Sequence, residues 1–145
     1  MLAEEYLSGR VRKWSLPVVR LGPEADQFLL KRLLLPQGEL AQVYDDPEGI
    51  RYIACIELIA GSVRGNHFHK VKAEWVYVLS GHADLMVKDI NTAEMAVLKL
   101  AKGDLAFIAT EVAHAMRVTG AGEAIEFSPA RFDSGDTHRH AVVAV

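Results

Sequence analysis

From residue 39 onward the sequence alternates short apolar runs with clusters of turn-forming residues, and this rhythm limits the possible folds more than any other feature. The run from Glu39 to Tyr44 ends in the turn-forming residues 45–49, and the run from Arg51 to Ala60 ends at Gly61. The same spacing continues to Phe127. Many short strands separated by turns are typical of an antiparallel sandwich or barrel. The sequence therefore predicts an all-β domain.

Composition excludes several classes of protein. A length of 145 residues predicts one domain, and a chain that is 50% hydrophobic and 24% charged has the composition of a globular protein. The net charge of −3 argues against a nucleic-acid partner. No apolar run approaches the ~20 residues that cross a bilayer. Charges run through the first 20 residues, unlike a signal peptide, and Cys55 is the single cysteine, so we expect a cytoplasmic protein.

The residues before the barrel are harder to interpret. The apolar spacing from Phe28 to Leu35 fits a buried helical turn and a strand equally well. This run needs a surface to cover, which predicts packing on the barrel or on a second copy of the chain. We therefore expect an N-terminal extension over residues 1–37, a barrel over 38–130 and a C-terminal tail over 131–145.

The chemistry is concentrated around two histidines. Side chains alternate along a strand, so His67 and His69 project from one face and Phe68 from the other. A tight connection brings Glu74 back beside them, and His114 follows a later strand. Three imidazoles and a carboxylate inside a barrel form a site for a divalent transition metal with positions left open for water or substrate.

The spacing of these residues resembles the first motif of the cupin superfamily, which reads Gly, five residues, His, one residue, His, three or four residues, Glu, six residues, Gly. The residues that fall in register are Gly61, His67, His69, Glu74 and Gly81. The second cupin motif is matched only in part. Its glycine and histidine are present and three turn or packing positions differ: Gly103 and His114 fit, whereas Ala109, Glu111 and Val118 replace Pro, Gly and Asn.

The resemblance implies a fold, a ligand set and a class of metal. The fold is a single double-stranded β-helix, the jelly-roll barrel of cupins. The metal ligands are His67, His69, Glu74 and His114. Similar proteins carry iron, manganese, nickel or zinc, and the sequence does not choose among them. Similar proteins also commonly dimerise through N-terminal segments, so we expect a homodimer.

A narrower resemblance concerns the phrase from Arg64 to Lys70, which looks like the Arg-Gly-x-His-x-His-Lys signature of cupins in nucleotide-sugar and surface-polysaccharide biosynthesis. One such group is the C-terminal cupin domain of capsular-polysaccharide sugar reductases, which has a metal site. Another is the metal-independent dTDP-sugar ketoisomerases, in which the paired histidines act as acid and base. The resemblance leaves both groups open.

Further residues are expected to line a pocket above the metal. Val76 and Val78 should face inward, and Met116, two residues after His114, should point the same way. With Phe107 they would form a mostly apolar pocket that suits a small organic ligand. Arg64 fits either a solvated loop position or a bidentate contact to phosphate or carboxylate.

Other notable residues have structural interpretations. Trp75 and Tyr77 lie on the strand face opposite the pocket and should pack outside the barrel. Lys70 and Lys72, in the connecting turn, should be solvated, as should the tail histidines at 138 and 140. Cys55 alternates within a strand, where an inert buried thiol is expected.

Three functions remain open at this point. The leading hypothesis is a metal-dependent enzyme acting on a sugar or sugar nucleotide, with the metal as Lewis acid in an isomerase or epimerase, or as an oxygen-activating Fe(II) centre in a dioxygenase. The second is metal-free isomerisation or epimerisation with His67 and His69 as general base and acid. The third is a cupin that binds a small ligand without converting it. No helix-turn-helix pattern is present, which argues against a transcriptional regulator.

Overall fold

The computed structural model describes residues 2–144, and its fold is all-β as predicted. The only helical segments within these residues are two 3-10 turns, η1 (Ala25–Gln27) and η2 (Ser134–Asp136). Among the described residues no helix has the length and apolar character to span a membrane.

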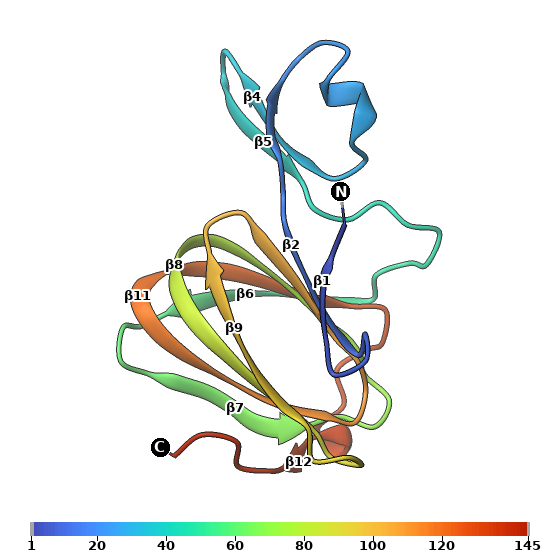
Figure 1. The fold of residues 1–145 in the computed structure, drawn as a ribbon, viewed down its shortest axis with the longest axis vertical. Coiled ribbons are helices and arrows are strands. Elements are labelled where there is room, and N and C mark those ends of the chain that lie inside the picture. The colour runs from blue at the N-terminus through green and yellow to red at the C-terminus, as the bar shows by residue number, and fades with distance from the viewer. Residues whose placement is uncertain (1, 145) are drawn as a thin grey trace.

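Nine strands form the main sheet, which curves into a barrel (Figure 1). The hydrogen-bonded order is β1-β2-β10-β8-β11-β7-β12, with β6 on β11 and β9 on β8. The bounds of these strands are β1 (Glu4–Tyr6), β2 (Val11–Ser15), β6 (Tyr52–Leu58), β7 (Val63–Phe68), β8 (Glu74–Asp89), β9 (Met95–Ala101), β10 (Asp104–Ile108), β11 (Val112–Ser128) and β12 (His138–Arg139).

The two longest strands, β8 and β11, pair with each other and bend together around the barrel (Figure 1). Their register shifts between Val118 and Ala124, opposite Gly81. Gly81 has a φ of +86°, and a Cβ atom there would lie 2.5 Å from the carbonyl oxygen of Gly120. Only glycine fits this bend, and the bend lets each long strand continue from one side of the barrel to the other.

The inside of the barrel is apolar except at one end. Each buried Val, Leu or Ile side chain contributes about 1.5–3 kcal/mol by leaving water. The largest cluster of buried side chains includes Val76, Val78, Leu85, Val87, Leu98, Ile108, Val112, Met116 and Val118. Val76 and Val78 therefore face inward, as predicted from alternation.

The N-terminal residues form strands. β1 and β2 extend the main sheet along β10, while β3 (Val18–Arg20), β4 (Lys31–Leu35) and β5 (Gly38–Gln42) form a separate three-stranded sheet at one end of the molecule (Figure 1). Its own small core contains Val19, Ala25 and Leu33. The boundaries at residues 37 and 130 and the homodimer stay predictions.

The expectation of a buried thiol at Cys55 is wrong. On β6, Ile53, Cys55 and Glu57 are exposed, while Ile56 packs against the barrel core. Both faces of this strand carry apolar residues, so the alternation of its sequence does not show which face points into the barrel.

Candidate functional site

The four residues predicted to bind a metal lie together at the polar end of the barrel. His67 is on β7, His69 follows it, Glu74 opens β8, and His114 is on β11. His114 is the direct partner of His67 across the β11–β7 ladder, and their ring centroids are 4.9 Å apart. One potential ligand atom from each of the four residues lies within 4.8 Å of the others.

A glycine between Arg64 and Asn66 makes this close approach possible. Gly65 has a φ of +96°, and a Cβ atom there would lie 2.7 Å from the carbonyl oxygen of His114. The ladder between β7 and β11 shifts its register at the same point, between His114 and Ala115. Any larger residue at 65 would separate the two strands and move the imidazoles apart.

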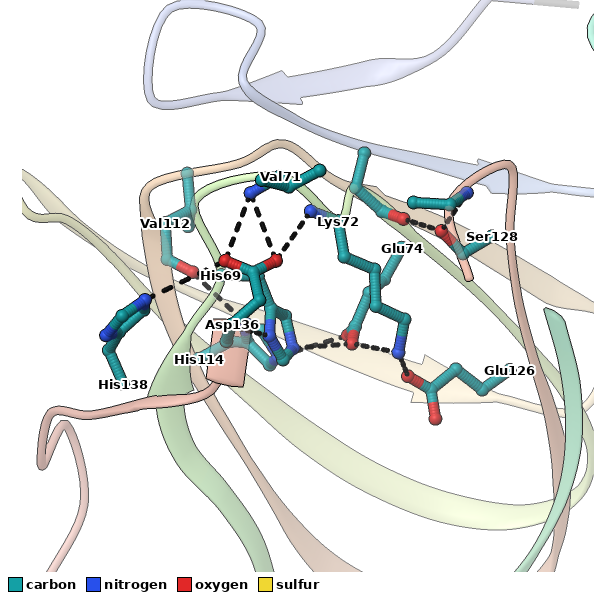
Figure 2. Close-up of polar contacts among 12 residues, drawn as sticks. His69, Val71, Lys72, Glu74, Val112, His114, Glu126, Ser128, Asp136 and His138 are labelled. Atoms are coloured by element: carbon teal, nitrogen blue, oxygen red, sulfur yellow. Dashed lines mark hydrogen bonds and ion pairs between the residues drawn. The ribbon is translucent and has the colours of Figure 1, made fainter. Parts of the chain in front are cut away.

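Backbone carbonyls orient two of the three imidazoles. His114 Nδ1 donates to the carbonyl oxygen of Val112 at 3.0 Å, and His69 Nδ1 donates to that of Asp136 at 2.8 Å (Figure 2). A carbonyl only accepts, so this network assigns the proton of each neutral ring to Nδ1. Their Nε2 atoms then face Glu74, at 3.1 Å from Oε2 for His114 and 2.9 Å from Oε1 for His69. Metal-binding histidines are commonly oriented in this way.

One consequence is a buried nitrogen without a hydrogen bond. In the neutral ring His69 Nε2 carries an electron pair that points at the Glu74 carboxylate, which also only accepts. The atom is buried and makes no hydrogen bond. A proton or a cation between the two groups would relieve this conflict.

The charges of the site are set by burial and by mutual contact. Burial lowers the pKa of His67 to about 4, helped by the positive charge of His114, so this ring is neutral at pH 7. Burial opposes ionisation of Glu74, but the charge and hydrogen bond of His114 outweigh it and hold the pKa of this carboxyl well below its usual range. Burial likewise opposes the charged form of His114, and the Glu74 carboxylate outweighs it and raises the pKa of the imidazole.

Lys72 belongs to the site, and the prediction that it is solvated is wrong. Its side chain is 6% exposed, and its Nζ lies 3.0 Å from Glu74 Oε1 and 3.0 Å from Glu126 Oε1 (Figure 2). The ammonium also lies 4.4 Å from the centre of the Tyr52 ring. Burial lowers the pKa of Lys72, but the two carboxylates outweigh burial and raise it, so the group is a cation at neutral pH. Lys70, in contrast, is exposed.

Glu126 is a site residue that sequence reasoning missed. It lies on β11 opposite Val76 of β8 and lines the same pocket. Burial, together with its contact to Glu74, raises the pKa of Glu126 to about 7. Strand alternation offered a signal, because Glu126 stands between the buried Ala124 and Ser128, at positions that share one strand face.

A pocket of about 680 Å³ opens above the cluster, within the size range of small-molecule sites. Arg64 and Met116 line it, and their contact with a substrate stays a prediction. Its wall also includes residues that the sequence did not single out, from β6 and from the C-terminal tail: Tyr52, Ile56, Phe132, Ser134 and Thr137.

Phe107 lies outside the pocket, and its prediction as a lining residue is wrong. It is the cross-strand partner of Trp75, with ring centroids 4.8 Å apart, and directly opposite residues share a face of the sheet. Both rings therefore lie on the outer face, where Arg12 stacks over Phe107. The inward neighbour is Ile108, which lines the pocket.

The tail histidines lie near the site without joining it. His138 stacks on Phe68, on the opposite face of β7 from His67, and its Nε2 is 3.7 Å from Asp136 Oδ1. His140 also packs edge-on against Phe68.

The cluster fits a divalent transition metal. Three imidazole nitrogens and one carboxylate oxygen are donors that zinc, iron, manganese and nickel accept. The unbonded Nε2 of His69 is available as a ligand atom. Lys72 is the competing feature, because its ammonium already neutralises Glu74 Oε1. The four residues could hold a metal, and their chemistry does not select one.

A family model described as "Polysaccharide biosynthesis C-terminal domain" matches residues 37–127. The matched part includes all four residues of the cluster and ends before the C-terminal tail. No curated protein matches the sequence.

Solved structures with the same fold include enzymes that act on nucleotide sugars. The RmlC epimerase of Mycobacterium tuberculosis has a TM-score of 0.73 and 16% identity over 96% of this chain and 72% of that one. RmlC of Legionella pneumophila, in complex with dTDP-4-keto-L-rhamnose, has a TM-score of 0.70 and 12% identity over 94% and 75%. The 3,4-ketoisomerase QdtA of Thermoanaerobacterium thermosaccharolyticum, in complex with TDP, has a TM-score of 0.66 and 21% identity over 77% and 84%. These similarities confirm the predicted fold, the jelly-roll barrel of cupins.

Proposed function

Because this chain belongs to the polysaccharide biosynthesis C-terminal domain family, we propose that it is an enzyme that isomerises or epimerises a nucleotide-linked sugar. One observation carries the proposal: the cluster of His67, His69, Glu74 and His114 lies in the wall of a pocket of about 680 Å³. Structures of the same fold hold TDP or a dTDP-linked keto sugar, which makes this class of substrate the first to test.

The pocket offers positive charge for a diphosphate. The chain as a whole has a net charge of −3, so an anionic substrate needs a local cationic site. Arg64 lines the pocket, and its guanidinium suits bidentate contact with phosphate oxygens. Lys72 contributes less to this charge, because its ammonium is paired with Glu74 and Glu126.

The proposed reaction is a proton transfer next to a sugar carbonyl. A metal held by His67, His69, Glu74 and His114 would act as a Lewis acid and make the neighbouring C–H bond more acidic. We assign the removal of that proton to Glu126, the pocket carboxylate outside the ligand set. Lys72, 3.0 Å from Glu126, holds the carboxylate in place. Return of a proton to the opposite face of the carbon gives an epimer. Return to the former carbonyl carbon gives an isomer, with the proton of the neighbouring hydroxyl passing to the former carbonyl oxygen.

Lys72 also favours a second candidate, which is the same reaction without a metal. Its ammonium lies 3.0 Å from Glu74 Oε1 and supplies positive charge to the cluster without an ion. In this version His67 and His69 are the base and the acid. The neutral state of the His67 ring at pH 7 is compatible with its acting as the base.

The experiment is proton exchange monitored by NMR. Metal-stripped protein and protein reconstituted with Zn²⁺, Mn²⁺, Ni²⁺ or Fe²⁺ are incubated in D₂O with 4-keto-6-deoxy sugars carrying TDP, UDP or GDP. We expect loss of the proton signal beside the carbonyl, and a rate at least about 100-fold lower in Glu126→Gln, the usual minimum for loss of a general base. Glu123→Gln, an exposed glutamate on the same strand, is the matched control and should exchange at the wild-type rate.

The outcomes separate the two candidates. Exchange that requires the added metal supports the metal-dependent enzyme, and full exchange in the stripped protein with chelator present supports the metal-free one. No exchange above the protein-free rate with any substrate in any metal form would contradict both.

A further inference from the structure

The C-terminal segment 131–144, here called the strap, crosses the β7–β8 turn that carries half of the site. Within it, β12 pairs with the end of β7, His138 opposite Phe68 and Arg139 opposite His67. Beyond β12 the strap is anchored by Asn66, whose Oδ1 accepts from the backbone N–H groups of Val142 at 2.9 Å and Val143 at 3.0 Å. The strap lies outside the residues matched by the family model.

Asp136 is the strap residue that hydrogen-bonds to both His69 and the backbone of the β7–β8 turn. Its buried carboxylate accepts hydrogen bonds from three consecutive backbone N–H groups of the turn, those of Lys70 at 2.8 Å, Val71 at 3.1 Å and Lys72 at 3.0 Å. Figure 2 shows the bonds from Val71 and Lys72. Its own carbonyl oxygen accepts from His69 Nδ1 at 2.8 Å. One residue therefore holds both the backbone of the turn and the ring that projects from it.

These contacts act on two groups of the site at once. The bond to His69 Nδ1 leaves Nε2 as the atom that faces Glu74. The bonds to the turn fix the backbone direction at Lys72, whose side chain then runs into the pocket to Glu74 and Glu126. Hydrogen bonds to a charged acceptor are about twice as strong as neutral ones, so the turn has a well-defined position.

We propose that Asp136 is the positioning residue of this site, which orients the His69 imidazole toward Glu74 and directs Lys72 into the pocket. The inference rests on the proposed use of the cluster as a metal or acid–base site. Partners that orient metal ligands typically change metal affinity by about 10- to 100-fold when they are removed.

The test compares two aspartates of the strap. Asp136→Asn replaces one acceptor oxygen by an NH₂ group that faces backbone donors, and it removes the charge. Asp133→Asn is the matched control, because Asp133 is exposed and its carboxylate only caps η2 through the N–H of Gly135 at 2.9 Å. Circular dichroism and thermal unfolding of both full-length variants establish that they are folded.

The first readout is Co²⁺ binding, followed by the visible absorption of the bound ion. We expect Asp136→Asn to bind Co²⁺ about 10- to 100-fold more weakly than wild type with an altered spectrum, and Asp133→Asn to match wild type. Wild-type affinity and spectrum in folded Asp136→Asn would overturn the inference.

The second readout needs no metal and separates the inference from the proposed function. Long-range ¹H–¹⁵N NMR of the histidine rings reports which nitrogen carries the proton. We expect His69 to carry it on Nδ1 in the metal-free wild type and in Asp133→Asn. Asp136→Asn keeps the backbone carbonyl that accepts from His69, but without the carboxylate bonds to the turn this carbonyl should shift relative to the ring, and we expect a mixture of tautomers. An unchanged His69 tautomer in Asp136→Asn overturns the positioning role, whereas failure of the wild type to bind Co²⁺ contradicts only the metal-dependent proposal.

Discussion

His114 and His69 face the same carboxylate, at 3.1 and 2.9 Å, but different parts of the chain hold them there. His114 bonds to the carbonyl of Val112, two residues away on its own strand. His69 bonds to the carbonyl of Asp136, 67 residues away in the strap. One half of the site is thus oriented by a single strand and the other by a tertiary contact. Local strand geometry and long-range packing contribute separately to the same cluster.

The largest expected effect is a loss of metal affinity that should be similar for the two histidines. If both are ligands, His69→Ala and His114→Ala should each weaken Zn²⁺ or Co²⁺ binding by more than about 100-fold, beyond the range seen for residues behind the ligands. Competition titration against a chromophoric chelator measures this. His140→Ala is the control, since its ring packs against Phe68, on the other face of β7. If either variant still binds the metal tightly, that histidine is not a metal ligand and the two histidines are not equivalent.

A smaller effect, on the stability of the strap, should appear on the His69 side of the site and not on the His114 side. Asn66 has a φ of +60°, and its side chain holds the end of the strap. Asn66→Gly keeps the backbone conformation but removes these hydrogen bonds, which should destabilise the fold by about 1–3 kcal/mol in denaturant unfolding. Amide exchange should accelerate at Val142 and Val143 and stay unchanged at His114. Equal protection of the strap in variant and wild type would contradict its anchoring by Asn66.

The third prediction concerns His67, whose ring makes no hydrogen bond within residues 2–144. Burial and the charge of His114 lower its pKa from 6.5 to about 4, and Glu74, His69 and Lys72 also face it. Between these values the unfolded chain binds a proton at His67 that the folded chain does not. Above pH 6.5 the ring is neutral in both states and does not lower the stability of the fold. As the pH falls from 6.5 toward 4, protonation of the unfolded chain at His67 lowers the free energy of unfolding.

His67→Gln tests this pH dependence in the metal-free protein. Without the titrating ring, the variant should lose less thermal stability than wild type between pH 7 and pH 5, as measured by calorimetry at both values. The same loss in both proteins would show that His67 is not the ring that resists protonation.

Local patterns predicted the parts of the molecule that local geometry builds. Strand alternation and turn spacing predicted the all-β fold, and alternation with a tight turn suffices to converge His67, His69 and Glu74. His114 was placed by its resemblance to the second cupin motif, and it joins the cluster through the pairing of β11 with β7. Lys72 was misplaced because its direction depends on Asp136, 64 residues away.

Pairing register was the other source of error. Phe107 faces outward because β10 pairs it with Trp75, and a single strand pattern does not contain that register. Cys55 was misplaced for the same kind of reason, since both phases of β6 carry apolar side chains. Alternation along β11 places Glu126 on the face of Ala124 and Ser128, and the pairing of β11 with β8 places it opposite Val76, in the pocket.

Anomalous diffraction from crystals grown with Zn²⁺, recorded on both sides of the zinc absorption edge, tests the central claim most directly. We expect one strong peak within about 2.0–2.2 Å of a nitrogen of His67, His69 and His114 and of a Glu74 oxygen. We also expect His69 Nδ1 to remain bonded to the carbonyl of Asp136. A cluster without a peak, with the Lys72 ammonium still against Glu74, would contradict the proposal that these four residues bind a metal.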